Sequence, residues 1–287
     1  MQERIPLIML LEGAGHRPPL PDDPPSFRTP GDLQAQADAS GRIPLATAVL
    51  GPSAGHGALS APLADFTVMT EQASIFTAGP PLVKASLGED ITKEELGGPG
   101  IALHSGVIHN LARNDESALE QIRNWLSYLP SSAWQTPIRL ADAEGERTVN
   151  ELLNIIPENP RQAYDMHDVI NAVADSGSVF TIQPMFGQSL ITCFARLSGR
   201  PVAIVANQPQ HMAGSITVEA ADKATQFIQV ADSFHLPLIF LTDNPGVLAG
   251  SSSEKAGILR HAGRMFLAQH HATVPKIQVT LRKAYGF

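Results

Sequence analysis

The residues of this chain best suited to chemistry lie in two turns, each of which ends a hydrophobic run in glycines. Residues 51–57 read GPSAGHG, and a second turn begins at Gly286-Phe287. Glycine tolerates positive φ and lets a ligand approach the backbone closely. Two backbone N–H groups that point at one spot form an oxyanion hole, which stabilises negative charge developing on a carbonyl oxygen. The turns therefore predict carbonyl chemistry supported by backbone donors.

The two turns belong to an internal repeat. When the sequence is shifted by 231 residues, residues 5–15 (IPLIMLLEGAG) align with residues 236–246 (LPLIFLTDNPG), and five of the eleven positions are identical. At the same shift Pro44 meets Pro275 and Gly55 meets Gly286. Chance rarely reproduces both a motif and its spacing, so the repeat predicts two homologous units with equivalent turns.

Alternating strands and helices must position these turns. Apolar runs predict strands at 5–11, 43–50, 179–184, 190–197, 202–207, 237–242 and 276–281, of which the first two read as buried. Periodicity predicts helices at 115–129, 220–234 and 254–269, the first capped by Asn114 or Asp115, whereas the proline-rich residues 18–30 read as a loop. We therefore expect an α/β fold with two domains, residues 1–130 and 131–287. The first strand and the last turn also suggest a longer protein cut at both ends.

Composition narrows the class of protein. The 287 residues carry a formal charge of −8, which disfavours nucleic acid or an anionic membrane as the main partner. No apolar run approaches the length of a membrane span, and no signal-peptide pattern opens the chain, so we expect a cytoplasmic protein. The single cysteine, Cys193, reads as a small buried hydrophobic residue.

A metal site and a nucleotide loop are not supported. None of the ten histidines belongs to an H-E-x-x-H pattern, and no Walker-type loop is present. We expect no metal and no cofactor-binding residue of this kind in the chain.

A serine hydrolase is the main competing interpretation. Residues 51–55 match G-x-S-x-G with Ser53 as nucleophile, and Asp243 followed by His261 or His270 supplies the order Ser, Asp, His. Against it, the repeat places Ala284 at the position of Ser53, and only about fifty residues precede the serine, too few for the usual strands of an α/β-hydrolase.

Longer motifs resemble the carboxyltransferase (β) subunit of biotin-dependent acyl-CoA carboxylases, nearest to the propionyl-CoA type. The motifs are 51–69 (GPSAGHGALSAPLADFTVM), 88–98 (GEDITKEELGG), 105–107 (SGV) with His109, 164–166 (YDM), 205–209 (VANQP), 239–246 (IFLTDNPG), 274–276 (VPK) and 282–286 (RKAYG). They cover nearly the whole chain in order. The lone cysteine separates the chain from the bacterial acetyl-CoA type, whose β subunit carries a zinc ribbon.

This resemblance implies two crotonase-like domains, each a repeated ββα spiral, and a ligase or transferase reaction. The carboxyl group of carboxybiotin, held on a separate carrier protein, passes to the α carbon of an acyl-CoA through two enolates, each in a backbone oxyanion hole. Gly55, His56 and Gly57 would form the first hole, and Gly286 and Phe287 would begin the second. The implied partners are acyl-CoA, a biotin carboxylase and carrier subunit, and further copies in a hexamer-like homo-oligomer. A eukaryotic member would lie in the mitochondrial matrix.

The chain departs from the family pattern at both turns. His56 and Phe287 stand where the family usually has glycine, and Glu12, Gly13 and His16 also differ from the usual residues. These changes bear on substrate choice more than on the class of reaction. A third hypothesis is a non-catalytic homologue or truncated piece that keeps the fold for assembly. Carboxylase, transcarboxylase and acyl-CoA decarboxylase remain open as variants of one scaffold.

Overall fold

The computed structural model describes residues 3–13, 15, 22, 31–141, 145 and 147–286. By internal packing the chain divides into two compact units, Met1–Arg123 and Asn124–Phe287. Most of the predicted loop at 18–30, together with His16 and Phe287, lies outside the described residues. The division falls inside a helix, so the domain boundary predicted at 130/131 stays a prediction.

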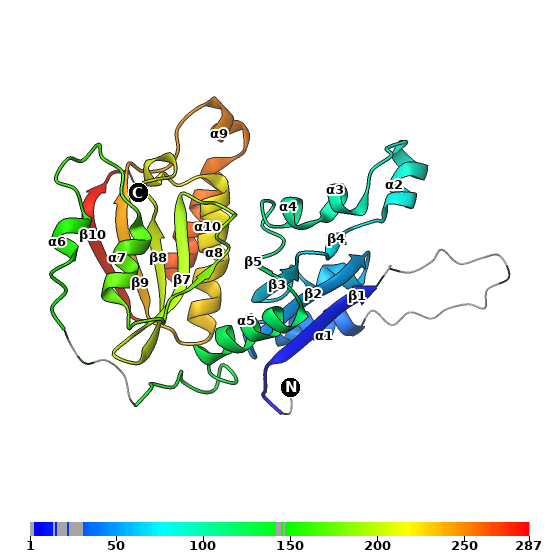
Figure 1. Ribbon diagram of the computed structural model, residues 1–287, viewed down its shortest axis with the longest axis horizontal. Coiled ribbons are helices and arrows are strands. Elements are labelled where there is room, and N and C mark those ends of the chain that lie inside the picture. Colours follow the sequence, from blue (N-terminus) through cyan, green and yellow to red (C-terminus); the bar gives the residue numbers. More distant parts are fainter. Residues whose placement is uncertain are drawn as a thin grey trace. The chain divides into compact units, whose positions relative to one another are not determined.

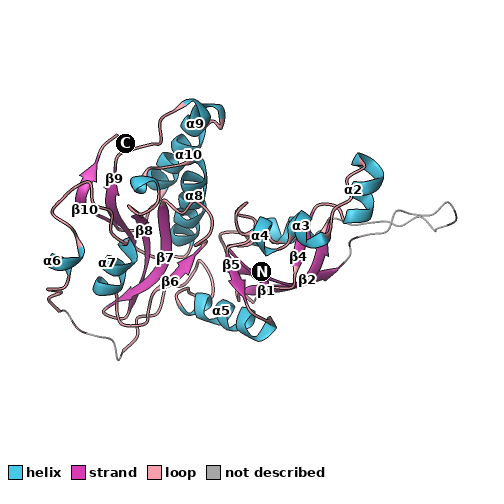
Figure 2. Ribbon diagram, turned by 45° about the horizontal axis from the view of Figure 1, so that its top comes forward, coloured by secondary structure: helices cyan, strands magenta, loops and turns pink. Residues whose placement is uncertain are grey.

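The first unit is built on a parallel sheet (Figures 1 and 2). Its strands are β1 (Leu7–Gly13), β2 (Leu45–Ala54), β3 (Phe66–Thr70), β4 (Ser74–Phe76) and β5 (Asn110–Ala112). They pair in the order β1-β2-β3-β5, and β4 pairs with the end of β2. The apolar side chains of β3 are buried, and so are those of β2 except for Leu50 and Pro52, which are half-buried. Such burial is expected for strands covered on both faces.

The first strand corrects one prediction. The sequence favours a buried strand at 5–11, but no residue of β1 is buried, and Leu10 is 56% exposed. An apolar run shows that a strand forms, whereas its burial depends on which neighbours cover it. Within the described residues β1 pairs only with β2, so one of its edges is open.

The first unit also contains short helices, and residues of their own sequence mark where some of them begin and end. They are α1 (Gly31–Ala39), the 3₁₀ helix η1 (Gly57–Ser60), α2 (Pro80–Leu87), α3 (Lys93–Gly97) and α4 (Pro99–Ala102). Helix α2 begins on a proline and ends at Gly88 with φ of 75°. Helix α3 begins in a capping box formed by Thr92 and Glu95. Among these elements, η1 matters most here because it follows the first glycine turn directly.

Helix α5 (Asp115–Ser127) confirms the predicted amphipathic helix. Ile122 and Trp125 are buried, whereas Asp115 and Glu116 are exposed. Asn114 caps the helix, since its Oδ1 accepts a hydrogen bond of 2.9 Å from Ser117 N–H.

The second unit holds a mixed sheet in the order β10-β9-β8-β7-β6. Its strands are β6 (Phe180–Ile182), β7 (Leu190–Leu197), β8 (Arg200–Asn207), β9 (Leu238–Asn244) and β10 (Lys276–Ala284), and its helical elements are α6 (Leu152–Ile155), α7 (Met166–Val173), η2 (Met212–Gly214), α8 (Val218–Ser233), α9 (Ser251–Lys255) and α10 (Ile258–His271). The pairs β6/β7 and β7/β8 are antiparallel, and the other two pairs are parallel.

Helices cover both faces of this sheet. Ile170 of α7 and Cys193 of β7 belong to one buried cluster, whereas the next residue of β7, Phe194, contacts Phe227 of α8 with ring centroids 4.9 Å apart. Because neighbouring side chains of a strand point to opposite faces, α7 and α8 lie on opposite sides. Figures 1 and 2 show α8 and α10 together on the side away from α7. Cys193 is fully buried, as predicted.

The helix predicted at 254–269 is two helices. Helix α9 ends at Lys255, and α10 begins at Ile258. Gly257 between them has φ of 81°, a conformation that interrupts a helix. The apolar periodicity continues across the break, so the pattern alone does not reveal it.

The internal repeat is confirmed by strand pairing. β1 pairs with β2 through Leu7↔Leu45, Ile8↔Ala46, Met9↔Thr47, Leu10↔Ala48, Leu11↔Val49 and, after a shift in register, Gly13↔Ser53. β9 pairs with β10 through Leu238↔Lys276, Ile239↔Ile277, Phe240↔Gln278, Leu241↔Val279, Thr242↔Thr280 and, after the same kind of shift, Asn244↔Ala284. Each residue of the second set lies 231 positions after its counterpart in the first. The two units thus present their glycine turns on equivalent parallel pairs.

Candidate active site at two glycine turns

The first turn connects β2 to η1. Gly55 has φ of 66°, a conformation that favours glycine, and its N–H donates to Phe76 O at 3.2 Å. That N–H is therefore part of the sheet and is not free for a ligand, so Gly55 shapes the turn instead of donating. The next two N–H groups, of His56 and Gly57, have no acceptor among the described residues. These two groups are the available oxyanion donors at this turn.

A cavity of about 330 Å³ opens beside these donors. Its walls combine the end of β1, the end of β2 and the start of η1: Leu10, Leu11, Glu12, Gly13, Gly15, Ser53, Ala54, His56, Gly57 and Ala58. Gly15 has φ of 79°, and a Cβ there would lie 3.2 Å from Ala54 O. The two chain segments thus approach each other at a position where a larger residue would be crowded.

The His56 side chain is held by an acidic residue of α1. Its Nε2 lies 3.0 Å from both carboxylate oxygens of Asp32. This hydrogen bond to His56, together with the backbone N–H of Leu33, lowers the pKa of Asp32. The sequence does not reveal this pair, because 24 residues separate its members and α1 carries no signal that it faces the turn.

The second turn follows β10 with the same geometry. Gly286 has φ of 73°, and Gly246 has φ of 108°, so that a Cβ on Gly246 would lie 2.8 Å from Tyr285 O. Gly246 and Gly286 are the repeat counterparts of Gly15 and Gly55. The N–H of Gly286 has no acceptor among the described residues. Phe287, the other residue predicted here, lies outside them.

A larger cavity, of about 690 Å³, lies at the second turn. It runs from Ala284, Tyr285 and Gly286 across β9 to Phe266 and His270 of α10. Four positions line both cavities at the 231-residue shift: Leu11/Thr242, Gly13/Asn244, Ser53/Ala284 and Ala54/Tyr285. The two candidate sites are therefore equivalent in the fold but differ in size and in side chains.

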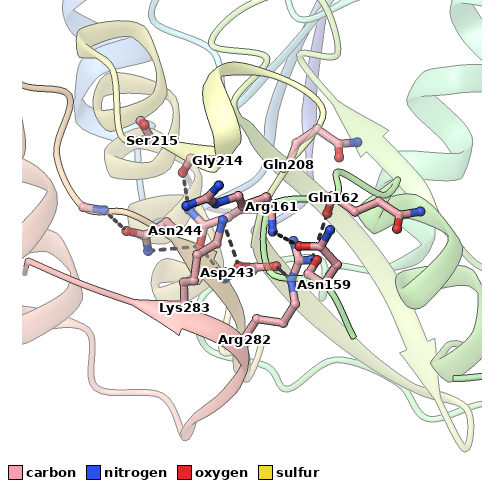
Figure 3. Close-up of polar contacts among 12 residues, drawn as sticks. Asn159, Arg161, Gln162, Gln208, Gly214, Ser215, Asp243, Asn244, Arg282 and Lys283 are labelled. Carbon is pink, nitrogen blue, oxygen red and sulfur yellow. Dashed lines mark hydrogen bonds and ion pairs between the residues drawn. The ribbon is translucent and has the colours of Figure 1, made fainter. Parts of the chain in front are cut away.

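A buried ion pair joins β9 and β10 near the second turn (Figure 3). Asp243, at the end of β9, is fully buried, and its Oδ2 accepts a hydrogen bond of 2.7 Å from Arg282 Nε. The guanidinium also donates to Asn159 O and Gln162 O, and its Cζ lies 4.7 Å from the centre of the Tyr164 ring. Burial, with a contribution from the Asp243 carboxylate, raises the pKa of the Tyr164 hydroxyl.

The side-chain amide of Asn207 continues this network toward the turn. Asn207 Oδ1 accepts from Asp243 N–H and from Asn244 Nδ2, while Asn207 Nδ2 donates to Gly214 O at 3.0 Å. Asn244 Oδ1 in turn accepts from Gly246 N–H at 2.6 Å. Polar contacts therefore hold the backbone on both sides of the second turn.

Within each unit, the contacts of the predicted triad residues do not fit a serine hydrolase. Ser53 lies inside β2 without positive φ, whereas a nucleophile elbow places its serine on a strained turn; its Oγ contacts only Gly51 O, at 3.4 Å. Asp243 is paired with Arg282, and the carboxylate beside His261 is that of Asp222, 2.6 Å away. The serine-hydrolase interpretation is wrong on this geometry.

Other candidate chemistry is also limited in the part of the chain that the structure describes. Burial raises the pKa of the Cys193 thiol to about 12, which makes it a poor nucleophile. The described residues contain no group of three or more His, Cys, Asp or Glu side chains placed to hold a metal ion. Nor do they include a helix long and apolar enough to cross a membrane.

Comparison with known proteins agrees with these features. The profile of the Carboxyl transferase domain family matches residues 1–286. The chain is 40% identical over 290 residues to the carboxyltransferase subunit of propionyl-CoA carboxylase from Haloferax mediterranei, covering 100% of this chain and 56% of that subunit. It is 41% identical over 254 residues to the α subunit of methylmalonyl-CoA decarboxylase from Veillonella parvula, covering 87% of this chain and 50% of the relative.

A solved structure shows the same fold. It is the hexameric transcarboxylase 12S with methylmalonyl-CoA and methylmalonic acid bound, with a TM-score of 0.92 and 36% identity over 99% of this chain and 56% of that one. The chain thus belongs to the carboxyl transferase domain family. Its fold is α/β and crotonase-like, with two homologous repeats. The chain spans about half the length of the curated relatives that it matches.

Proposed function

We propose that this chain is the carboxyltransferase component of a biotin-dependent acyl-CoA carboxylase or a close variant. It would transfer the carboxyl group of carboxybiotin, held on a separate carrier, to the α carbon of an acyl-CoA. The observation that carries this proposal is the duplicated glycine turn, with identical strand register and a cavity at each copy. Carboxyl transfer needs two sites because an enolate forms on each of its two substrates.

The residues at the turns fit this chemistry. The free N–H groups of His56 and Gly57 can hold one developing oxyanion, and the free N–H group of Gly286 can begin the second hole. Phe287, which lies outside the described residues, is proposed as the next donor of that hole. When bound, biotin supplies both the carboxyl group and the base, so the chain needs no catalytic carboxylate or imidazole of its own. The protein itself binds and orients the two substrates and stabilises the developing negative charge. Each donor of this kind contributes about 3–4 kcal/mol to transition-state stabilisation.

The relatives suggest the substrates and partners. One is named for propionyl-CoA, another for methylmalonyl-CoA, and the transcarboxylase structure holds methylmalonyl-CoA. We therefore propose a short acyl-CoA as substrate, with a biotin carboxylase or biotin carrier as partner and a homo-oligomer as the assembly. The boundary between the two homologous domains would lie near residue 130 of the sequence. The protein would act in the cytoplasm or the mitochondrial matrix.

A pair of variants at His56 tests the first hole. His56→Pro removes one backbone donor, and proline suits the observed φ of −56°. His56→Ala is the matched control, because it removes the side chain and keeps the N–H. Transfer of carboxyl groups from methylmalonyl-CoA to biotin, measured with the natural full-length protein, should fall by roughly 10²–10³ in His56→Pro. His56→Ala should stay within about tenfold of the wild type.

Comparing His56→Pro with His56→Ala shows whether the reaction uses the backbone N–H of residue 56. Equal loss in both would show that the backbone donor is not used. A wild-type protein that is folded and oligomeric but transfers no carboxyl group would favour a non-catalytic homologue.

A further inference from the structure

The second turn starts at the peptide bond between Tyr285 and Gly286. Gly246 packs directly against this peptide, because a Cβ built on Gly246 would lie 2.8 Å from Tyr285 O and 3.5 Å from Gly286 Cα. Tyr285 is also held through its N–H, which donates to Asn244 O at 3.3 Å. Because the peptide is planar and trans, the position of Tyr285 O fixes the direction of Gly286 N–H. Any residue that holds Gly246 in place therefore helps to orient the backbone donors of this turn.

Asn244 holds Gly246 in place through its side chain. Its Oδ1 accepts a hydrogen bond of 2.6 Å from Gly246 N–H, two residues further along the chain. A bond of this kind mimics a backbone turn and fixes the segment that it spans. Since the carbonyl oxygen of Asn244 also accepts from Tyr285 N–H, one residue contacts both segments of the turn. The repeat counterpart of Asn244 is Gly13, which has no side chain, so of the two turns only the second is held in this way.

A buried residue in turn fixes the amide group of Asn244. Asn244 Nδ2 donates to Asn207 Oδ1 at 3.2 Å, and the same oxygen accepts from Asp243 N–H. Asn207 is 4% exposed, and its own Nδ2 donates to Gly214 O at 3.0 Å. An amide donates from its nitrogen and accepts at its oxygen, so the two contacts of the Asn244 side chain match its two ends. The orientation of this side chain is thus set from within the fold.

We propose that Asn244 is a positioning residue of the second turn: it holds Gly246 against the Tyr285–Gly286 peptide and so sets the direction of the backbone donors there. The inference rests on the proposed function, which assigns one of the two oxyanion holes to this turn. Removal of a residue with this role weakens an interaction made in the transition state, so it lowers kcat and kcat/KM together. A residue that contacts the substrate in the ground state would instead raise KM.

Two variants of Asn244 separate these roles. Asn244→Ala removes the acceptor of Gly246 N–H, whereas Asn244→Ser keeps a hydroxyl oxygen that can accept from the same N–H, more weakly. The matched control is Asn154→Ala, at an exposed asparagine of α6. All are made in the natural full-length protein, and carboxyl transfer from methylmalonyl-CoA to biotin is measured over a range of both substrate concentrations.

The expected result is a loss of kcat that the serine restores. In Asn244→Ala, kcat should fall roughly tenfold while both KM values stay within about twofold, since a small displacement of a group at the reacting centre costs up to ~10²-fold in rate. Asn244→Ser should return kcat to within about threefold of the wild type. Asn154→Ala should leave kcat and both KM values unchanged.

Hydrogen exchange gives a readout that does not depend on the reaction. Exchange of the peptide 244–250, followed by mass spectrometry, should be several-fold faster in Asn244→Ala than in the wild type, because Gly246 N–H loses its acceptor. In Asn244→Ser it should stay close to the wild type. A merely structural role would lower the melting temperature of Asn244→Ala and leave the kcat of the folded protein unchanged.

Three results would overturn the inference: wild-type kcat in Asn244→Ala, equal loss of kcat in Asn244→Ser, or a raised KM with kcat unchanged. Each can occur while the wild type transfers carboxyl groups, which would leave the proposed function intact. A folded wild type that transfers none would refute the function instead. The exchange measurement would then decide by itself whether Asn244 holds the turn.

Discussion

At the residue scale, the two copies of the turn differ in how an acidic side chain is accommodated. Asp243 and Arg282 of the second unit are the repeat counterparts of Glu12 and Gly51. Arg282 neutralises buried Asp243, whereas in the first unit the Glu12 side chain lies over the glycine, and a Cβ on Gly51 would be 2.8 Å from it. The first cavity therefore keeps a carboxylate in its wall, and the second has its carboxylate buried and paired.

Breaking the buried pair should destabilise the second unit strongly. Arg282→Met leaves Asp243 buried without its main partner, which typically costs about 3–5 kcal/mol. For a domain of this size the melting temperature should fall by roughly 6–20 °C. Lys283→Met is the matched control, because Lys283 Nζ is 3.8 Å from the same carboxylate, and should cost much less. Equal thermal shifts in the two variants would contradict the importance of the Arg282 contact.

Ser53 should be dispensable for catalysis. It is buried inside β2, and its repeat counterpart is Ala284, so Ser53→Ala should change carboxyl transfer by no more than a few fold. Steady-state kinetics of full-length protein provide the measurement. A loss of about 10⁴-fold would instead identify Ser53 as a nucleophile.

At the element scale, the repeat and most elements were predictable from sequence, because apolar periodicity and a fixed spacing report local geometry. The open edge of β1 was not predictable, because the same apolar run also fits a covered strand. The break at Gly257 was not predictable either, because the same periodicity also fits an unbroken helix. The pair Asp243–Arg282 was also missed, although parallel pairing of β9 with β10 brings the ends of both strands together. His56 was found as a departure from a motif, but its partner Asp32 required the placement of α1.

One carboxyl group joins the starts of two strands in the first unit. Asp65 Oδ2 accepts from Leu45 N–H at 2.8 Å, and Asp65 N–H donates to Leu45 O. Burial raises the pKa of Asp65 to about 7, although the hydrogen bond from Leu45 N–H opposes this rise. In the unfolded chain the carboxyl ionises near pH 4, so the folded state binds the proton more tightly. Stability conferred by the neutral acid is present below about pH 4 and is lost as the pH rises toward 7.

Asp65→Asn should remove this dependence, because the amide oxygen still accepts from Leu45 N–H and cannot ionise. Denaturant unfolding at pH 5 and pH 8 should show the wild type losing up to a few kcal/mol relative to the variant at the higher pH. Parallel pH dependence in both proteins would show that Asp65 is not buried as a neutral acid.

At the scale of the whole molecule, each unit leaves apolar side chains exposed along one sheet edge. Leu7, Ile8 and Leu10 of β1 are exposed in the first unit, and Ile277 and Val279 of β10 in the second. Such surfaces mark interaction sites in natural proteins. We expect the natural full-length protein to be a homo-oligomer at micromolar concentration, as measured by light scattering. A stable monomer would contradict the proposed assembly.

The central claim is that two equivalent turns carry out carboxyl transfer between a CoA ester and biotin. The most direct measurement is transfer of labelled carboxyl groups from methylmalonyl-CoA to free biotin by the natural full-length protein. We expect labelled carboxybiotin and propionyl-CoA in equal amounts, with no product when biotin is omitted. Release of free CoA at a rate independent of biotin, or the absence of labelled carboxybiotin from a folded oligomer, would contradict it.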